Sequence, residues 1–289
     1  MKSSSSPTSW PQIALFVVLL TVFSAVFNYI ILRAHALRGA GGLYTVGITW
    51  SFGLAAMLTM KLSGRSLSEL GWKWPTARYA RISWLIPLAY SFIAYAIVWI
   101  TGLGKFPNRE FMASRVEYMG LHASPTASTI VYIVLTGTFG ILGIMVTALG
   151  EEIGWRGFLV PELYKSNSFL RTVLFSGVIW TLAHFPVLIW ADYNAGTPKW
   201  YEITCFTVLV MSLSLIFAWI RLKSGTLWTG VLLHASHNLY IQRIFTPLTA
   251  DAGHTAWYID EFGLVVPLVV AALAFYFFTR RKELQPSVI

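Results

Sequence analysis

Eight long, continuous apolar runs constrain the fold of this chain more than any other feature. A helix of about 20 apolar residues crosses the roughly 30 Å of hydrocarbon in a bilayer. Inside lipid only helices and closed barrels satisfy all their backbone hydrogen bonds, and barrel strands alternate in polarity, which these runs do not. The predicted spans are Trp10 to Leu32, Leu43 to Leu62, Ile82 to Thr101, Ala127 to about Leu149, Phe169 to Trp190, Trp200 to Ile220, Thr226 to about Phe245, and Trp257 to Thr279.

Composition supports the same class of protein. Hydrophobic residues make up 56% of the 289 residues and charged residues only 11%. A soluble domain of this size could not solvate such a surface. We therefore predict an all-α, polytopic membrane protein with about eight transmembrane helices, the fourth continuing as a helix to about Leu163.

The distribution of Lys and Arg predicts the orientation. If the N-terminus is cytoplasmic, 14 of the 21 Lys and Arg residues lie on the cytoplasmic side and 7 on the other, as the positive-inside rule expects. We expect both termini in the cytoplasm, in a bacterial plasma membrane. Topology and anionic lipids account for the net charge of +9, so no nucleic-acid partner is expected. The first apolar run is longer than the apolar core of a cleaved signal peptide, which has about 7 to 15 residues, so cleavage is not expected.

The rest of the chain indicates one domain. Residues 10–283 are expected to form a single membrane-embedded helical domain with its catalytic core at about 127–245, between a disordered Ser-rich segment at 1–9 and a polar tail at 284–289. No repeat or nucleotide-binding glycine loop is visible. A short surface helix is expected around Arg109 to Met119. The carboxylates expected to be solvated at external helix ends are Asp192, Glu202, Asp251, Asp260 and Glu261.

Ionisable residues at membrane depth are candidates for function because a charge there is costly. The candidates are Glu151, Glu152 and Arg156 in one motif, His184 in a second, and His234, His237 and Asn238 in a third. His237 is interpreted as structural. No role is assigned to His35, His122 or His254, which fall in external loops.

Helix geometry predicts how the first two motifs meet. The turn at Lys165 to Ser168 closes the fourth and fifth helices into an antiparallel hairpin. At about 1.5 Å per residue, Glu151 and His184 both lie roughly 20 to 24 Å from that turn. They should face each other if the rotation of the two helices allows it. His234 should lie about two turns shallower unless its helix is offset or tilted.

Helix rotation separates the two glutamates. Glu152 and Arg156 have i,i+4 spacing, about 40° apart and suited to an ion pair, whereas Glu151 points about 140° away from Arg156. Glu152 and Arg156 are therefore supporting residues, and Glu151 is left for chemistry. His234 and Asn238 share a face and could stabilise an oxyanion. Glycines 150, 154 and 157 are expected to allow close helix packing.

The ordered set Glu151-Glu152-x-x-x-Arg156, Trp180-x-x-x-His184 and His234-x-x-x-Asn238 resembles the CAAX protease and bacteriocin-processing family of intramembrane endopeptidases. The resemblance covers about residues 127–245, with Leu70-Gly71-Trp72 as a weaker match. Trp180 departs from the Phe that the family usually shows. The resemblance implies that Glu151 and His184 activate a water, while His234 and Asn238 form the oxyanion hole.

Two questions stay open at this level. Glu151, His184 and His234 could ligate a divalent metal such as zinc, but there is no His-Glu-x-x-His motif and the Asn238 amide is a poor zinc ligand. We therefore expect that no cofactor is required, with a metal as the alternative. The second question is the activity itself.

We expect an intramembrane endopeptidase, surrounded by membrane lipids, that cleaves a membrane-associated peptide or protein, lipidated or leader-bearing, reached from the cytoplasmic side. The alternatives are a non-catalytic bacteriocin-immunity or scaffolding relative and a small transporter. A transporter should show broken helices in two matching halves, and none is visible. A relative without activity should have lost one of the four catalytic positions, and all four are present.

Overall fold

The protein is all-α, as predicted. The computed structural model describes residues 10–120 and 123–284. The segments 1–9, 121–122 (with His122) and 285–289 lie outside the described residues, and so do the predictions made for 1–9 and for all but the first residue of the tail at 284–289. The described part contains no strand, and its one β-bridge joins Lys105 to Ala250.

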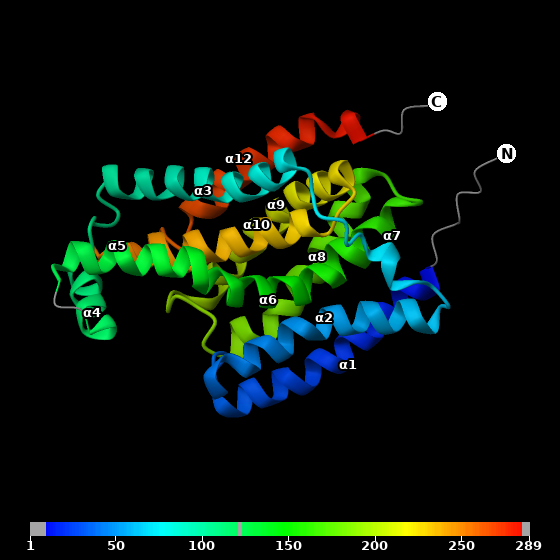
Figure 1. Cartoon of the computed structure of the whole chain (residues 1–289), viewed down its shortest axis with the longest axis horizontal. Coiled ribbons are helices and arrows are strands. Elements are labelled where there is room, and N and C mark those ends of the chain that lie inside the picture. Colours follow the sequence, from blue (N-terminus) through cyan, green and yellow to red (C-terminus); the bar gives the residue numbers. More distant parts are fainter. Residues whose placement is uncertain (1–9, 121–122, 285–289) are drawn as a thin grey trace.

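The bundle is built from twelve α-helices within the described residues, joined by short turns and wider π-helical segments (Figure 1). Their bounds are α1 Trp10–Ala34, α2 Leu43–Leu62, α3 Ala77–Ile100, α4 Arg109–Met119, α5 Pro125–Leu135, α6 Ile141–Glu152, α7 Val160–Tyr164, α8 Phe169–Trp190, α9 Lys199–Ser224, α10 Trp228–Asn238, α11 Thr246–Leu248 and α12 Val265–Thr279. The expected surface helix is α4.

Six helical stretches of the described chain are long and apolar enough to cross a membrane, so the predicted count of eight is not confirmed. They are Trp10–Ala34, Ala40–Leu62, Ala77–Ile100, Pro125–Tyr164, Phe169–Trp190 and Lys199–Ser224. The predicted seventh run is helical from α10 through a π-helical segment to α11.

The predicted start of the eighth span at Trp257 is wrong. Helix α12 begins at Val265, and Trp257 ends a short 3-10 turn instead. Asp260 takes a positive φ of 65°, which an α-helix cannot contain, and the neighbouring Glu261 makes contacts outside the helix. Apolar composition alone therefore placed the helix start too early.

The predicted fourth helix is one continuous helical run from Pro125 to Tyr164. Two π-helical segments, Thr136–Gly140 and Ile153–Leu159, interrupt its α-helical pattern. Single π turns inside α-helices are frequent at functional sites, and the second segment follows directly on Glu152. The turn at 165–168 closes this run onto α8, whose N-cap is Ser168.

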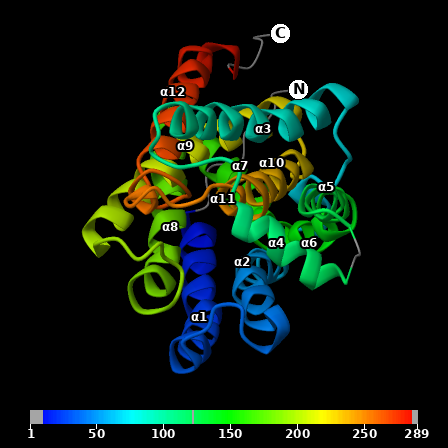
Figure 2. The ribbon, with the colours of Figure 1, turned by 90° about the vertical axis from the view of Figure 1, so that its left-hand side faces the viewer.

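Helix α6 packs between α2 and α10, and α8 packs on α9 (Figures 1 and 2). A Cβ on Gly150 would lie 3.0 Å from the Thr49 carbonyl oxygen, and one on Gly154 would lie 3.0 Å from the Phe52 carbonyl oxygen. These two glycines allow the close packing that the sequence predicted. Gly157 has only ordinary contacts, the nearest at 3.5 Å.

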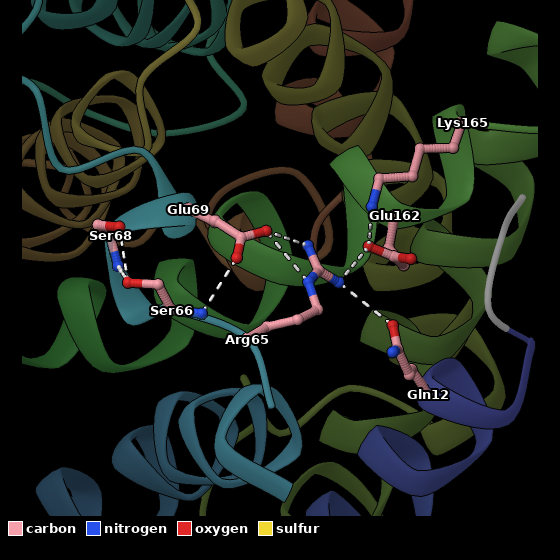
Figure 3. A network of polar contacts seen from close by, with 7 residues as sticks. All are labelled: Gln12, Arg65, Ser66, Ser68, Glu69, Glu162 and Lys165. Atoms are coloured by element: carbon pink, nitrogen blue, oxygen red, sulfur yellow. Dashed lines mark hydrogen bonds and ion pairs between the residues drawn. The ribbon is translucent and has the colours of Figure 1, made fainter. Parts of the chain in front are cut away.

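A polar network stabilises the end of the bundle where the turn at 165–168 lies (Figure 3). The Arg65 guanidinium donates to Glu162 at 2.9 Å, to Gln12 at 3.2 Å and to Glu69 at 2.9 Å. Lys165 also contacts Glu162, at 2.7 Å. These bonds join α1, α7 and the connection between α2 and α3, and the Arg65 guanidinium lowers the pKa of Glu69.

Candidate active site

The four predicted catalytic side chains line one cavity of about 510 Å³. Residues of α2, α6, α8, α9 and α10 form its walls, and Glu151, His184, His234 and Asn238 all contribute to it. The supporting residues Glu152 and Arg156 lie behind this wall, fully buried. The structure thus brings together side chains that lie on three different helices.

The cavity reaches the surface at one end of the bundle. Its lining includes the exposed residues Arg38 and Gly41 of the connection between α1 and α2, together with the first turns of α2. This connection lies at the opposite end from the hairpin turn at 165–168 (Figure 1). Any ligand that enters here passes the α1–α2 connection before it meets Glu151.

Two indoles hold the Glu151 carboxylate by one of its oxygens. Oε2 accepts hydrogen bonds from Trp180 Nε1 at 3.2 Å and from Trp155 Nε1 at 3.4 Å. Oε1 has no hydrogen bond to any described residue. Glu151 is buried and lines the cavity, so its orientation is fixed while one oxygen stays available.

Glu152 forms the predicted ion pair with Arg156, at 3.0 Å. The same oxygen, Oε1, also contacts His234 Nδ1 at 3.0 Å. His234 therefore lies at the level of Glu152. The two-turn difference in depth does not occur, and the alternative of an offset or tilted helix holds instead. Gly230 allows this approach, since a Cβ there would lie only 2.3 Å from Glu152 Oε2.

Arg156 is packed between two aromatic rings. Its guanidinium carbon lies 4.2 Å from the centre of the Trp180 ring and 4.3 Å from that of Phe217. Cation–π contacts of this kind strengthen when they are removed from water, and Arg156 is only 1% exposed. Arg156 is thus a structural charge behind the cavity rather than a group that could reach a ligand.

The tautomer of His184 follows from its partner. Its Nδ1 lies 3.0 Å from the Trp180 carbonyl oxygen, which can only accept a hydrogen bond, so Nδ1 carries the proton. Nε2 of the neutral ring is then an acceptor. The side chain of Asn238, half-buried in the cavity wall, has no hydrogen bond within the described residues.

A second polar cluster lines the cavity beside Asn238. His237 contacts Tyr90 at 2.6 Å and Glu261 at 2.9 Å, so both of its ring nitrogens are bonded. Glu261 also accepts hydrogen bonds from Gln242, at 3.0 Å, and from Tyr193. These bonds support the structural interpretation of His237.

Two of the carboxylates that were expected to be solvated are buried. Glu261 is 4% exposed and Glu202 is fully buried. Glu202 accepts hydrogen bonds from the backbone of Ala195 and Thr197, at 2.9 and 3.0 Å. The prediction was wrong because both lie near helix ends that fold back onto the bundle, where backbone and side-chain donors replace water.

Trp180 is a residue of the candidate site whose contacts the sequence analysis missed. It was noted only as a departure from a family pattern, yet its indole contacts Glu151 and Arg156, and its ring lies 5.8 Å from that of His234. The sequence did offer a signal for these contacts, since the N–H of a buried indole usually finds a hydrogen-bond acceptor.

The geometry does not match a zinc site. In residues 10–120 and 123–284 no three His, Cys, Asp or Glu side chains gather closely enough to hold a metal ion. Glu151, His184 and His234 share the cavity but do not form such a group.

Comparison with known proteins shows what the segment that holds these residues is similar to. Residues 133–240 match the family of type II CAAX prenyl endopeptidases, Rce1-like. This segment contains all four predicted catalytic residues. "CAAX prenyl protease 2" of Methanococcus maripaludis is 26% identical over 87 residues, which are 28% of this chain and 31% of that protein. The match therefore spans about a third of the relative's length.

The family match and the ordered motifs agree on the same helices, α5 through α10. The resemblance drawn from the sequence is confirmed, and over residues 133–240 this integral membrane protein is similar to the Rce1-like family of type II CAAX prenyl endopeptidases.

Proposed function

We propose that this protein is an intramembrane endopeptidase that hydrolyses a peptide bond in a membrane-associated substrate, through a water activated by Glu151 and His184. One observation carries the proposal. A carboxylate held by only one oxygen and a histidine with a free Nε2 lie on facing helices and line the same cavity. Both groups can accept a proton from a water between them.

In the proposed reaction the activated water attacks the carbonyl carbon of the scissile bond. One of the two bases, Glu151 or His184, takes the proton that the water loses while the other accepts a hydrogen bond from the water, and the carbonyl electron pair moves to its oxygen. When the intermediate collapses, the C–N bond breaks and the proton passes to the leaving amine. No step requires a metal.

His234 and Asn238 donate hydrogen bonds to the developing oxyanion. If His234 Nδ1 donates to Glu152, its Nε2 carries a proton only in the imidazolium form, which the adjacent carboxylate favours. Glu152 then acts as a positioning residue that keeps His234 a donor, and Arg156 balances its charge. Asn238 provides a neutral amide donor on the same face of α10.

The substrate class is a peptide or protein held in or at the membrane, lipidated or leader-bearing. Under the charge count, the open end of the cavity lies on the non-cytoplasmic side. If the N-terminus is cytoplasmic, a substrate therefore cannot enter the open end of the cavity from the cytoplasm. Reporter fusions that establish the topology decide between these two expectations.

The test compares membranes from cells that express the wild type or Glu151→Gln. The variant keeps its shape and hydrogen-bonding capacity but cannot accept a proton as a base. We expect it to insert normally and to lose every cleavage product found with the wild type by mass spectrometry of N-terminal and C-terminal peptides. Identical peptide sets would contradict the proposal, and activity abolished by a zinc chelator would contradict its metal-free form.

A further inference from the structure

The π-helical segment Ile153–Leu159 leaves one buried carbonyl oxygen without a backbone donor. The Val160 N–H donates to the Trp155 carbonyl oxygen, as the wider π pattern requires, and so does not serve Arg156. The next residue is Pro161, and proline has no N–H. The Arg156 carbonyl oxygen therefore lacks both of the backbone partners, four or five residues ahead, that an α-helix or a π-helix provides.

Pro161 also favours the π turn itself. In an α-helix the ring of a proline clashes with the carbonyl of the residue four positions earlier, which here is Gly157. A wider turn before the proline relieves this clash. The turn follows Glu152 directly and contains Arg156, so the geometry of their ion pair depends on the turn.

Arg221, in the last turn of α9, supplies the missing donor. Its Nε donates to the Arg156 carbonyl oxygen at 2.6 Å. Arg221 is only 7% exposed and forms no ion pair with a carboxylate of any described residue. An unpaired carbonyl is costly away from water, and a charged donor makes a short, strong hydrogen bond. The Arg221 side chain thus takes the place of the backbone N–H that Pro161 lacks.

Arg221 also packs against the connection that holds the start of α10. A Cβ on Gly71 would lie 2.8 Å from Arg221 Nη2, so a glycine leaves room for the guanidinium at this point. The Gly71 carbonyl oxygen accepts a hydrogen bond from the Leu227 N–H at 3.0 Å. Leu227 directly precedes α10, the helix that carries His234. One side chain therefore contacts both the π turn and the connection that positions α10.

We propose that Arg221 is a positioning residue: by holding the Arg156 carbonyl it fixes the π turn that follows Glu152. Glu152 contacts His234 Nδ1 at 3.0 Å, so the same bond keeps His234 placed for the oxyanion. The proposal rests on the proposed function, in which His234 is an oxyanion donor. Arg221 is not among the described residues that line the cavity, so it acts through its neighbours and not on the substrate.

The test uses a synthetic peptide that contains a cleavage site found with wild-type membranes. Arg221→Met keeps an apolar stem but removes every donor. We expect kcat to fall about 10- to 100-fold with little change in KM, because the cavity lining is intact. Arg221→Lys keeps a charged donor without the planar fork and should retain part of kcat. Arg281→Met removes a donor to the Phe278 carbonyl oxygen after α12, and this matched control should keep wild-type kcat.

A second substitution tests how Arg221 acts. Pro161→Ala restores a backbone N–H for this part of the helix, so the Arg156 carbonyl oxygen no longer depends on the guanidinium. Arg221→Met should therefore cost much less kcat in the Pro161→Ala background than in the wild type. An equal loss in both backgrounds would overturn the proposal, because Arg221 would then act other than through this carbonyl. If Arg221→Met does not fold, Arg221→Lys is compared in the same two backgrounds.

An NMR measurement separates this proposal from the proposed function. In protein with isotope-labelled histidine, the Nδ1 signal of His234 reports its contact with Glu152, and Glu152→Gln marks the signal without that carboxylate. Arg221→Met should move the signal toward this mark, and added Pro161→Ala should move it back. An unmoved signal would overturn the positioning role even if turnover falls. A signal that moves as expected in a protein that cleaves no peptide would support the positioning role and contradict the endopeptidase.

Discussion

The indole nitrogen of Trp180 on α8 donates a hydrogen bond to Oε2 of Glu151 on α6, across 3.2 Å. The same indole ring covers the guanidinium of Arg156 at 4.2 Å. One side chain therefore orients the proposed base and packs the charge that balances the neighbouring carboxylate. A phenylalanine at this position could make only the second contact.

Trp180→Phe should separate these two contributions. The variant retains an aromatic ring over Arg156 but removes one donor from Glu151. Because a hydrogen bond to a charged group contributes about 1.5 to 3 kcal/mol, we expect turnover to fall about 10- to 100-fold while thermal unfolding changes little. Trp219→Phe, which removes an indole bond to the Arg280 carbonyl oxygen far from the cavity, should keep wild-type turnover. Full activity in Trp180→Phe would show that Glu151 does not need this donor.

A double-mutant cycle should show that Glu152 and Arg156 are coupled. Their ion pair is buried on both sides, and removing one partner of a buried pair can cost about 3 to 5 kcal/mol. We expect Glu152→Gln and Arg156→Gln each to lower thermal stability, and the double variant to be more stable than the sum of the two losses predicts. Glu151→Gln and Arg156→Gln should be nearly additive. Coupling between Glu151 and Arg156 instead would mean that the two glutamates have been assigned in the wrong order.

Gly230→Ala tests the close approach of α10 to Glu152. The added Cβ would lie 2.3 Å from Glu152 Oε2 and 3.2 Å from Arg156 Cγ, both fully buried. Overpacking of this kind costs about 1 to 3 kcal/mol, and it should also shift His234 away from the cavity. We expect lower thermal stability and lower turnover. Gly137→Ala, where nothing lies within 4 Å of the new Cβ, should change neither.

The features that could be predicted from the sequence follow from local helix geometry. The hairpin, the different directions of the Glu151 and Glu152 side chains, and the pairing of Glu152 with Arg156 depend on rise and rotation along a single helix or across one tight turn. Those quantities are nearly constant in all α-helices. The ion pair at 3.0 Å was therefore predicted correctly.

The features that could not be predicted depend on how distant segments pack. The depth of His234 is set by Gly230, which lets α10 approach α6, and a single sequence does not show how far neighbouring helices slide. The burial of Glu261 depends on donors that lie from 19 to 68 residues away in the chain. The start of α12 was misplaced because Trp257 and Tyr258 are apolar enough to suggest a helix. The positive φ of Asp260, which excludes a helix there, is not visible in the residue pattern.

Asn238→Ala should weaken catalysis without affecting the fold. The amide has no protein partner among the described residues, so its removal leaves no buried group unsatisfied. Loss of one oxyanion donor costs about 2.7 to 4 kcal/mol of transition-state stabilisation, which we expect to appear in kcat. The measurement is turnover of a cleaved peptide together with a thermal unfolding curve. Undiminished turnover in this variant would exclude Asn238 from the oxyanion hole.

Reporter fusions should establish which end of the bundle faces the cytoplasm. One reporter follows the C-terminal end of the chain, and the other is inserted near Gly253. Leu284 lies at the hairpin end, since its carbonyl oxygen accepts a hydrogen bond from Tyr164. Ala250 lies at the opposite end, where it pairs with Lys105 beyond the end of α3. From the excess of Lys and Arg at the hairpin end, we expect a reporter fused after Ile289 to be cytoplasmic and one inserted near Gly253 to be external.

The same measurement assigns the side from which a substrate reaches Glu151. The Leu37–Asp192 and Tyr201–Trp257 hydrogen bonds connect the α1–α2 connection to the segment that contains Gly253. The open end of the cavity and Gly253 are therefore on the same side. If Gly253 is external, substrates come from outside the cytoplasm. If both reporters give the opposite result, the charge count is wrong and the cavity opens to the cytoplasm.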